Sequence, residues 1–239
     1  MKKTVLIGLL ALMLSACTVT QDVFLHRDGS GEVRIDIELD EMVTSYARDI
    51  YAGFTEDTGN IAIFDTAAVE RYFLANPSSG LISLENPSPG SLFLSVRFTS
   101  AEDILDQDSY DLPPVIRVSE SRGVTTVVFN LAPDNMRILT DPVSMTDTEL
   151  IQVFGPQPDR PYTEEEYLEV IAYAFADYLD GDGAAGVLSA ASVTVRVKTE
   201  GEIVGVSGGR KQGDTALFSI PFIDIVTMSE PIVLSVSYR

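Results

Sequence analysis

Apolar and polar residues alternate along several short segments, as they do in β-strands that bury one face. Residues 32–39 show this most strictly, with apolar side chains at every second position: Val33, Ile35, Ile37 and Leu39. Residues 19–26 alternate less cleanly, and the sequence Asp28-Gly29-Ser30-Gly31 between the two segments has turn chemistry. The pattern predicts an N-terminal β-hairpin.

More strands are predicted in the middle and in the last third of the chain. They lie at residues 81–84, 92–98, 115–119, 124–131, 193–197, 203–206, 216–220 and 232–238. Turn-forming sequence with proline or glycine separates the first two of these segments, and also the next two. Two further hairpins are therefore expected before residue 132.

Helical spacing of apolar residues appears in three places. Asp40 is placed to cap a helix that runs to Phe54, and residues 67–74 suit a shorter helix. The third and strongest helical signal begins at Thr163, which forms a capping box with Glu166. An apolar stripe continues to Leu179, and Gly181 is placed to end the helix.

Residues 132–161 hold five of the twelve prolines and are expected to form an irregular connection. The elements together predict an α+β fold, in which a mainly antiparallel sheet of hairpins packs against two or three helices.

The first sixteen residues have the order of a secretory signal peptide. Lys2 and Lys3 precede an apolar stretch from Val5 to Leu14, and the small residues Ser15 and Ala16 follow it. The stretch is shorter than the ~20 apolar residues that a membrane-spanning helix needs. We therefore expect residues 1–16 to be removed on export.

The sequence Leu14-Ser15-Ala16-Cys17 resembles the lipobox of bacterial lipoproteins. The resemblance implies cleavage between Ala16 and Cys17, with a diacylglycerol and an acylated amine on Cys17. Residues 17–22 would then be an acylated N-terminus with a short tether, and residues 23–239 a single envelope domain. The alternative is an ordinary signal peptide with a chance cysteine. Two or more acyl chains give stable membrane anchoring.

Lipoproteins kept in the inner membrane of Gram-negative bacteria commonly have an aspartate after the cysteine, whereas this chain has Thr18. In such an envelope the lipobox resemblance therefore favours the outer membrane, facing the periplasm.

Charge and cysteine content narrow the range of functions. All 36 acidic residues follow residue 16, but only 14 of the 16 basic residues do. Residues 17–239 therefore have a net charge of −22. Such a surface repels nucleic acid, and it indicates either a solvated acidic surface or one that binds cations such as calcium. Acylation of Cys17, the sole cysteine, leaves no thiol for a disulfide or a nucleophile.

Candidate catalytic and metal groups are sparse. His26 is the sole histidine, so histidine-based triads and the usual zinc sites are not expected, and neither is a cofactor. Asp177, Asp180 and Asp182 suggest a calcium loop, but the EF-hand positions that follow are alanines. The alternative to a calcium loop is that these residues form the end of a helix and a flexible turn after it. No catalytic residue is assigned, although 36 acids leave a carboxylate-based hydrolase as a minor alternative.

Aromatic residues gather on the helix that begins after Thr163. Tyr167, Phe175 and Tyr178 are candidates to line an apolar ligand pocket, and the alternative is that they fill a core.

Both ends of the chain after residue 16 carry a second resemblance. The opening CTVTQDVFLHRDGSGEVRIDIEL, and residues 195–203 with Gly208-Gly209 and residues 213–218, are similar to LppM-like bacterial envelope lipoproteins. The chain departs from that family in having Glu200-Gly201 for Pro-Gly, Phe218 for tryptophan, and no C-terminal membrane helix. The resemblance implies a β-rich envelope domain whose sheet curls around a helix and has room for a lipid-sized cavity.

Two functions follow from these observations. The first is a non-enzymatic lipoprotein that binds or scaffolds a partner at the membrane surface, held there by the lipid on Cys17. The second is a carrier or binder of a lipid or another apolar ligand between sheet and helix. The expected partners are accordingly the membrane and either an envelope protein or a lipid ligand.

Overall fold

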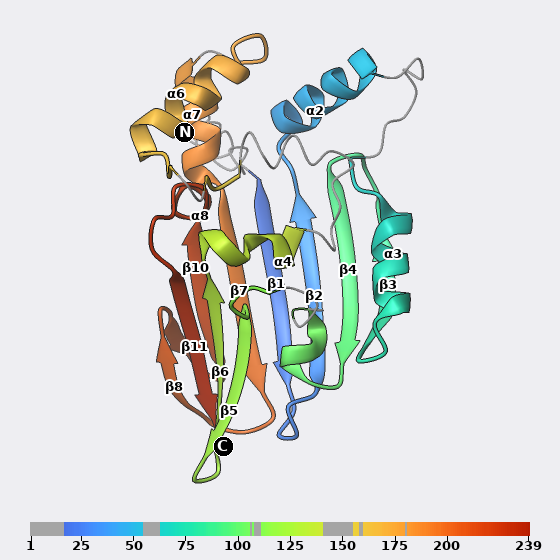
Figure 1. Ribbon diagram of the computed structural model, residues 1–239, viewed down its shortest axis with the longest axis vertical. Helices are drawn as coiled ribbons and strands as arrows, with labels where there is room; N and C mark the ends of the chain where they lie inside the picture. The colour runs from blue at the N-terminus through green and yellow to red at the C-terminus, as the bar shows by residue number, and fades with distance from the viewer. Residues whose placement is uncertain are drawn as a thin grey trace, which may run out of the picture.

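The computed structural model describes residues 17–54, 63–105, 107, 111–140, 155–157, 160–179 and 181–239. Across these residues the chain forms two β-sheets, with helices gathered at one end and others along the side (Figure 1). All but one of the strand pairings are antiparallel. The predicted α+β class is confirmed.

The larger sheet has seven strands in the order β3-β4-β2-β1-β7-β10-β9. Their bounds are β1 Thr18–Leu25, β2 Gly31–Glu38, β3 Ser79–Glu85, β4 Ser91–Phe98, β7 Ser192–Thr199, β9 Arg210–Gln212 and β10 Thr215–Pro221. The exceptional parallel pair is β1 with β7, which joins the N-terminal hairpin to the last third of the chain. This pairing puts β1 and β7 near the middle of the sheet.

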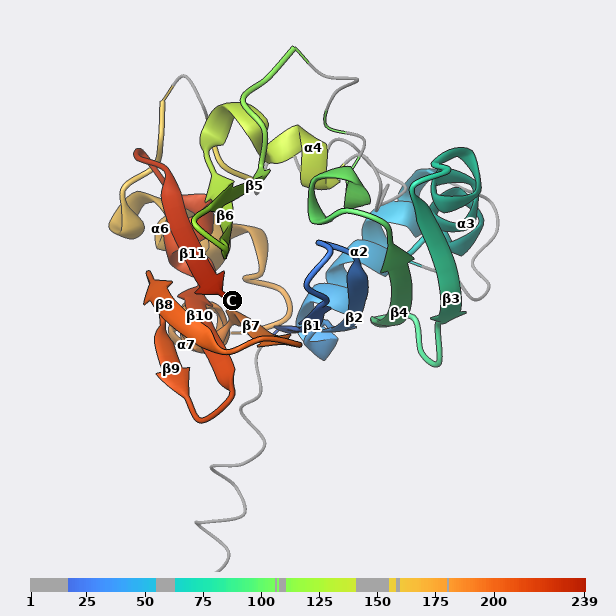
Figure 2. The same ribbon diagram turned by 90° about the horizontal axis from the view of Figure 1, so that it is seen from below.

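The smaller sheet has four strands in the order β5-β6-β11-β8. Their bounds are β5 Ile116–Ser121, β6 Val124–Leu131, β8 Ile203–Ser207 and β11 Ile232–Tyr238. The chain crosses from β8 to β9, and so from one sheet to the other, at Gly208 and Gly209. Gly208 has φ of +73°, and a Cβ on Gly209 would collide with the Phe218 ring. Seen from below, the two sheets form one curled wall (Figure 2).

The predicted strands are confirmed, with one correction at the N-terminus. Residues 18–22 are part of β1, whereas we expected them to form a tether. Thr18 already pairs with Glu38 of β2 and Ser192 of β7. The ladder hydrogen bonds on both sides of β1 satisfy its backbone from the first residue, so the domain begins directly after Cys17.

The longer helices are α2 Glu41–Phe54, α3 Thr66–Ala75, α6 Glu164–Ala174 and α7 Gly181–Ala190. Asp40 and Asp65 accept backbone hydrogen bonds at the starts of α2 and α3. α6 begins at the predicted capping box, but it ends at Ala174, five residues before Leu179. The apolar stripe misled the prediction because the turn after Phe175 packs into the same core as the helix. Gly181 starts α7 and does not end α6.

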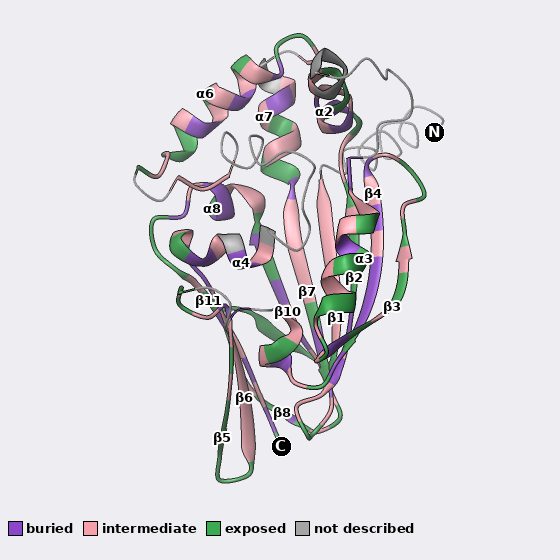
Figure 3. Ribbon diagram, turned by 45° about the vertical axis from the view of Figure 1, so that its right-hand side comes forward, coloured by how far each residue is buried: buried purple, intermediate pink, exposed green. Residues whose placement is uncertain are grey.

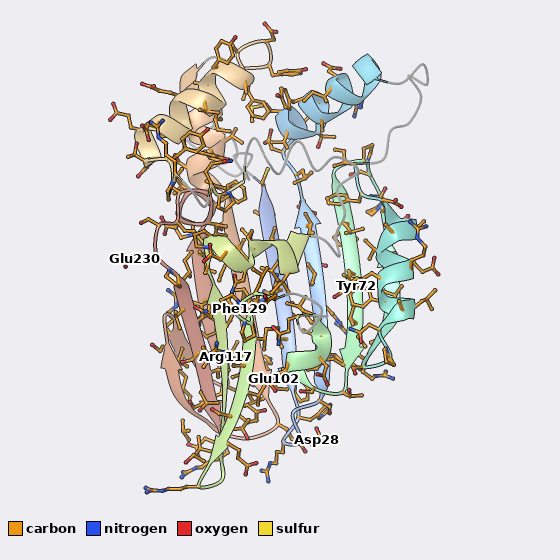
Figure 4. All side chains as sticks on the ribbon, in the orientation of Figure 1. Asp28, Tyr72, Glu102, Arg117, Phe129 and Glu230 are labelled. Carbon is orange, nitrogen blue, oxygen red and sulfur yellow. The ribbon has the colours of Figure 1, made fainter. Side chains whose placement is uncertain are left out.

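Short helices complete the fold: η1 Ala101–Ile104, η3 Pro133–Asn135, α4 Met136–Thr140 and α8 Phe222–Val226. η3 and α4 open the proline-rich segment that we expected to be irregular, and α4 buries Ile138. Glu102 of η1 lies beside β5 (Figure 4), where its carboxylate accepts the N–H of Val118 at 2.6 Å.

The core has three parts. The largest lies between the two sheets and includes Leu25, Phe98, Phe218, Leu234 and Tyr238. A second joins α2, α6, α7 and α8 around Tyr167, Ile171 and Phe175. A third holds α2 against the start of β4. The helical layer therefore has a core of its own at one end of the sheets.

Candidate functional site

Cys17, the predicted acylation site, directly precedes β1, and β1 begins at the end of the larger sheet where α2, α6 and α7 gather (Figure 1). Its Sγ atom accepts a hydrogen bond from the N–H of Asp40 at 3.4 Å. Burial raises the pKa of the Cys17 thiol, so the thiol is protonated at neutral pH. Ala16, on the other side of the predicted cleavage site, lies outside the described residues.

The inner face of the central strands is apolar and only half buried. We call it the central face and define it by seven residues from β1, β2 and β7: Val19, Gln21, Val23, Ile35, Ile37, Val193 and Val195. They lie in register across the three strands, with Val19 between Ile37 and Val193. Figure 3 shows intermediate burial along β1 and β7.

The strands on either side are covered much better. The inward side chains of β4 and of β10 are buried, including Leu94, Val96, Phe218 and Ile220. A central strand normally has the best-covered inner face, because neighbours lie on all sides. Here the order is reversed, so the middle of the sheet has less cover than its flanks.

Exposure of the central face is graded along the strands. In the two rows nearest Cys17, those of Val19 and Gln21, the residues are half buried on all three strands. In the next row Val23 is half buried, but its neighbours Val33 and Val197 are buried, and Leu25 is buried beyond them. The face is therefore open towards the Cys17 end and closed at the opposite end.

Gln21 is the one polar member of the central face. It lies between Ile35 of β2 and Val195 of β7, which leaves its amide among apolar neighbours. Within the described part of the chain this amide forms no hydrogen bond. The amide is not among the buried side-chain groups that lack a partner, so it is open to water and can donate to and accept from a ligand.

The elements opposite the central face are apolar too. Val127 and Phe129 of β6, and Met136 and Leu139 of α4, pack on the core from the other side but stay half buried. Phe129 is labelled on β6 in Figure 4 and packs on the largest core, and Figure 2 places α4 across from β1 and β2. The interior of the curled wall is thus apolar on both sides and incompletely covered.

The predicted ligand-binding aromatic residues lie elsewhere, in the helical layer. Tyr167 and Phe175 have exposed fractions of 1 % and 4 %, so they fill the core of that layer and do not line a pocket. Burial raises the pKa of the Tyr167 hydroxyl. Tyr178 is half buried, and its hydroxyl donates a hydrogen bond to Asp49 of α2 at 2.5 Å. Core packing, the alternative that we considered for these residues, accounts for Tyr167 and Phe175.

The acidic residues considered for calcium are not brought together in the described residues. Asp177 is exposed on the turn after α6, Asp180 lies outside the described residues, and Asp182 belongs to the first turn of α7. The described residues contain no group of three or more His, Cys, Asp or Glu side chains arranged to hold a metal ion. The turn that we considered as the alternative is present, but a helix begins directly after it.

A groove on α6 was missed at the level of sequence. It has a volume of about 600 Å³ and lies between one face of α6 and the residues that precede the helix. Glu166, Glu169, Val170 and Tyr173 contribute that face at helical spacing. This spacing could have indicated the groove from the sequence. The prediction followed the apolar stripe on the opposite face of the helix, which is the stronger pattern.

Comparison with known proteins gives weak matches to solved structures. No protein-family model matches the sequence, and no curated protein matches it either. The NMR structure of the folded domain of LppM from Mycobacterium tuberculosis is similar over 94% of this chain and 90% of that chain, with a TM-score of 0.40 and 9% identity. It belongs to the family that the chain ends resemble, and membership stays a prediction.

Two M1 zinc metallopeptidase structures are similar at a lower level. One, a two-domain enzyme bound to tryptophan, has a TM-score of 0.29 at 11% identity. The other, from Deinococcus radiodurans, has a TM-score of 0.27 at 9% identity. This chain spans 42% of each. None of these similarities assigns it a function.

Proposed function

We propose that this protein is a lipid-anchored, non-enzymatic envelope protein that binds an acyl chain on its central face. The observation that carries the proposal is the incomplete burial of apolar side chains on the inner side of the middle strands. Leaving apolar area in water costs about 25 cal/mol per Å², so a face of this kind is stabilised by an apolar occupant.

The chemistry of the central face suits an acyl chain better than a compact polar molecule. The face is lined by valine and isoleucine in rows along the strands, and it supports contact with a linear hydrocarbon. Each methylene removed from water contributes about 0.8 kcal/mol. Gln21 supplies a donor and an acceptor for the polar head of such a ligand.

The anchor and the central face lie at the same end of the sheet. A lipid on Cys17 would be attached one residue before β1, so the domain would be held close to the bilayer without a linker. In that position the open end of the central face is directed to the membrane, where acyl chains are available. With Thr18 after the cysteine, we propose the periplasmic side of the outer membrane in a Gram-negative envelope.

The anchor is supported by the lipobox resemblance and by the single cysteine. In the described residues, no helix has both the length and the apolar character to span a membrane. The test is metabolic labelling with an alkyne fatty acid, comparing the wild-type chain with Cys17→Ser. We expect label and membrane association in the wild type alone. Equal label in both would overturn the anchor and leave ligand binding untouched.

Ligand binding is tested on the mature chain, residues 17–239, with Cys17→Ser so that no lipid is attached covalently. Native mass spectrometry and lipid extraction should detect a co-purified acyl ligand, and titration with cis-parinaric acid should give saturable fluorescence. Val195→Asp, which puts a charge on the central face, should weaken binding of the probe at least tenfold.

Val233→Asp is the matched control because Val233 is an exposed strand residue on the outer side of β11. Val195→Phe is a second variant, which fills the central face without adding charge and should also weaken binding. If wild type and all three variants bind the probe equally, the central face is not the site. If the wild type binds no probe and carries no lipid, the scaffolding function predicted from the sequence remains.

A further inference from the structure

The groove on α6 has a mixed lining that differs from the central face. One wall is the helix face with Glu169, Val170 and Tyr173, and the other wall is formed by Gln157, Arg160 and Tyr162. Its volume of about 600 Å³ lies within the usual range of about 300–1,000 Å³ for small-molecule sites. The groove is therefore large enough for a ligand of several rings.

Two tyrosine rings supply the apolar part of the groove. Tyr173 has an exposed fraction of 88 %, although it lies on a helix whose other face is well packed. Tyr162 packs on the buried Tyr167, and the centroids of the two rings are 5.9 Å apart. One ring is thus fixed by packing, and the other stands in solvent with a free face. Exposed aromatic rings that are rigid and amphipathic are typical of recognition surfaces.

The polar groups of the groove include both donors and acceptors. Arg160 and Glu166 form an ion pair at 3.5 Å, so opposite charges already balance there. Glu166 also accepts the N–H of Thr163 at 3.0 Å, which fixes its carboxylate against the helix start. Glu169 is exposed and forms no hydrogen bond or ion pair with the described residues. Gln157 adds an amide, which donates and accepts.

We propose that this groove binds a neutral oligosaccharide. A sugar ring has an apolar face that stacks on tyrosine, and its hydroxyl groups both donate and accept hydrogen bonds. The charges of Arg160 and Glu166 balance each other, and the negative charge of Glu169 disfavours an anionic ligand. A hydroxyl-rich neutral ligand with apolar ring faces is the class that satisfies both the rings and the mixed charges.

The proposal is independent of the acyl-chain site. The groove is formed by α6 and the residues before it, whereas the central face belongs to β1, β2 and β7. Variants in one site leave the residues of the other unchanged. Binding of oligosaccharide and binding of cis-parinaric acid are therefore separate measurements, and each proposal fails or stands by itself.

The test is an NMR titration of the mature Cys17→Ser chain with three neutral probes: chitotriose, cellotriose and maltotriose. We expect saturable shifts at the backbone amides of Gln157, Glu169 and Tyr173 with at least one probe. Tyr173→Ala should weaken that affinity about tenfold, or about 1.4 kcal/mol. Tyr173→Phe keeps the ring and should stay within about twofold of the wild type.

Leu74→Ala is the control for removal of a large exposed side chain, because Leu74 of α3 has an exposed fraction of 77 % and is not part of the groove. It should leave the affinity unchanged. The proposal is overturned if none of the three probes shifts the groove amides. It is also overturned if Tyr173→Ala binds as well as Leu74→Ala.

Discussion

The Tyr178 hydroxyl and the Asp49 carboxylate form a hydrogen bond of 2.5 Å, which joins the turn after α6 to α2. Tyr46 of α2 packs on the same turn, with its ring 4.5 Å from Phe175 and 5.9 Å from Tyr178. The hydrogen bond therefore closes an aromatic cluster that holds two helices together. It requires Tyr178 to be protonated, because the tyrosine hydroxyl is the donor.

The first prediction concerns the titration of Tyr178. The hydrogen bond to Asp49, with burial and the negative charge of Asp49 adding to it, raises the pKa of Tyr178 to about 12. Because the pKa in the folded state lies above that of the unfolded chain, the bond stabilises the fold fully below the unfolded pKa. This contribution is lost as the pH rises through about 12.

The pKa of Tyr178 is measured by following tyrosinate absorbance in the ultraviolet as the pH rises. The Tyr178→Phe variant identifies which part of the absorbance change comes from Tyr178. Asp49→Asn should lower the pKa of Tyr178 towards its usual value. Asp177→Asn is the control, because Asp177 contributes charge alone and should lower the pKa less. Equal effects of the two substitutions would show that charge, and not the hydrogen bond, sets the pKa.

The second prediction concerns the start of α6. Thr163 Oγ1 accepts the N–H of Glu166 at 3.2 Å, and Glu166 accepts the N–H of Thr163 at 3.0 Å. Thr163→Ala should reduce the free energy of unfolding by about 1 kcal/mol, as loss of an N-cap usually does. Urea denaturation of both chains measures the difference.

Glu166 gives the same cap a pH dependence. The hydrogen bond from the Thr163 N–H lowers the pKa of Glu166. Its contribution to stability is therefore present above the unfolded pKa and is lost as the pH falls through the folded pKa. The stability difference between wild type and Glu166→Gln should shrink in acid. Glu165→Gln, in the same exposed turn, is the control for loss of one carboxylate at the helix start.

The capping box illustrates what the sequence can predict. Thr163 and Glu166 are three residues apart, and their bond depends on local geometry alone, so the pattern sufficed. The pairing of Thr18 with Ser192 is different, because alternation indicates which face of a strand is apolar and does not indicate its neighbour. The parallel contact of β1 with β7 was therefore not predicted, although both strands were.

The candidate site was harder to predict than the fold. Val19, Val23 and Val195 have the pattern of ordinary inward residues, and their incomplete burial depends on what packs opposite them. Tyr167 and Phe175 had the composition of a pocket but lie in a core. Burial in each case is set by contacts between elements far apart in the chain, which periodicity does not contain.

The third prediction is that Gln21→Leu stabilises the ligand-free domain. Its amide lies between Ile35 and Val195 and forms no hydrogen bond with the described residues. Replacing it with leucine should raise the free energy of unfolding by about 1 kcal/mol, because an apolar side chain packs on these apolar neighbours better than the amide does. Thr20→Leu, on the outer face of β1, should give no comparable increase. A destabilised Gln21→Leu variant would show that the amide is satisfied in the free protein.

The fourth prediction concerns Asn135, whose side chain has an exposed fraction of 0 %. Its Oδ1 accepts the N–H of Ala132 at 2.8 Å, and its Nδ2 donates to the carbonyls of Asn130 at 2.9 Å and Pro113 at 3.2 Å. One amide thus ties the end of β6 to the segment that leads into β5. Asn135→Ala leaves the buried N–H of Ala132 without its partner, and it removes the hydrogen bonds to the part-buried carbonyl groups of Asn130 and Pro113. An unsatisfied buried group costs about 1–3 kcal/mol.

We therefore expect Asn135→Ala to lower the free energy of unfolding by about 3 kcal/mol or more in urea denaturation. Asn135→Asp keeps the shape of the side chain but replaces the Nδ2 donor with a carboxylate oxygen, which cannot donate to the two carbonyls. It should therefore lower the free energy of unfolding as much as Asn135→Ala does at neutral pH. Its deficit should lessen in acid, because a protonated carboxyl donates to one of those carbonyls again. Asp134→Ala, at the exposed neighbouring position, should change stability by less than about 0.5 kcal/mol. If Asn135→Ala were as mild as Asp134→Ala, the three hydrogen bonds would not be holding β6 to the start of β5.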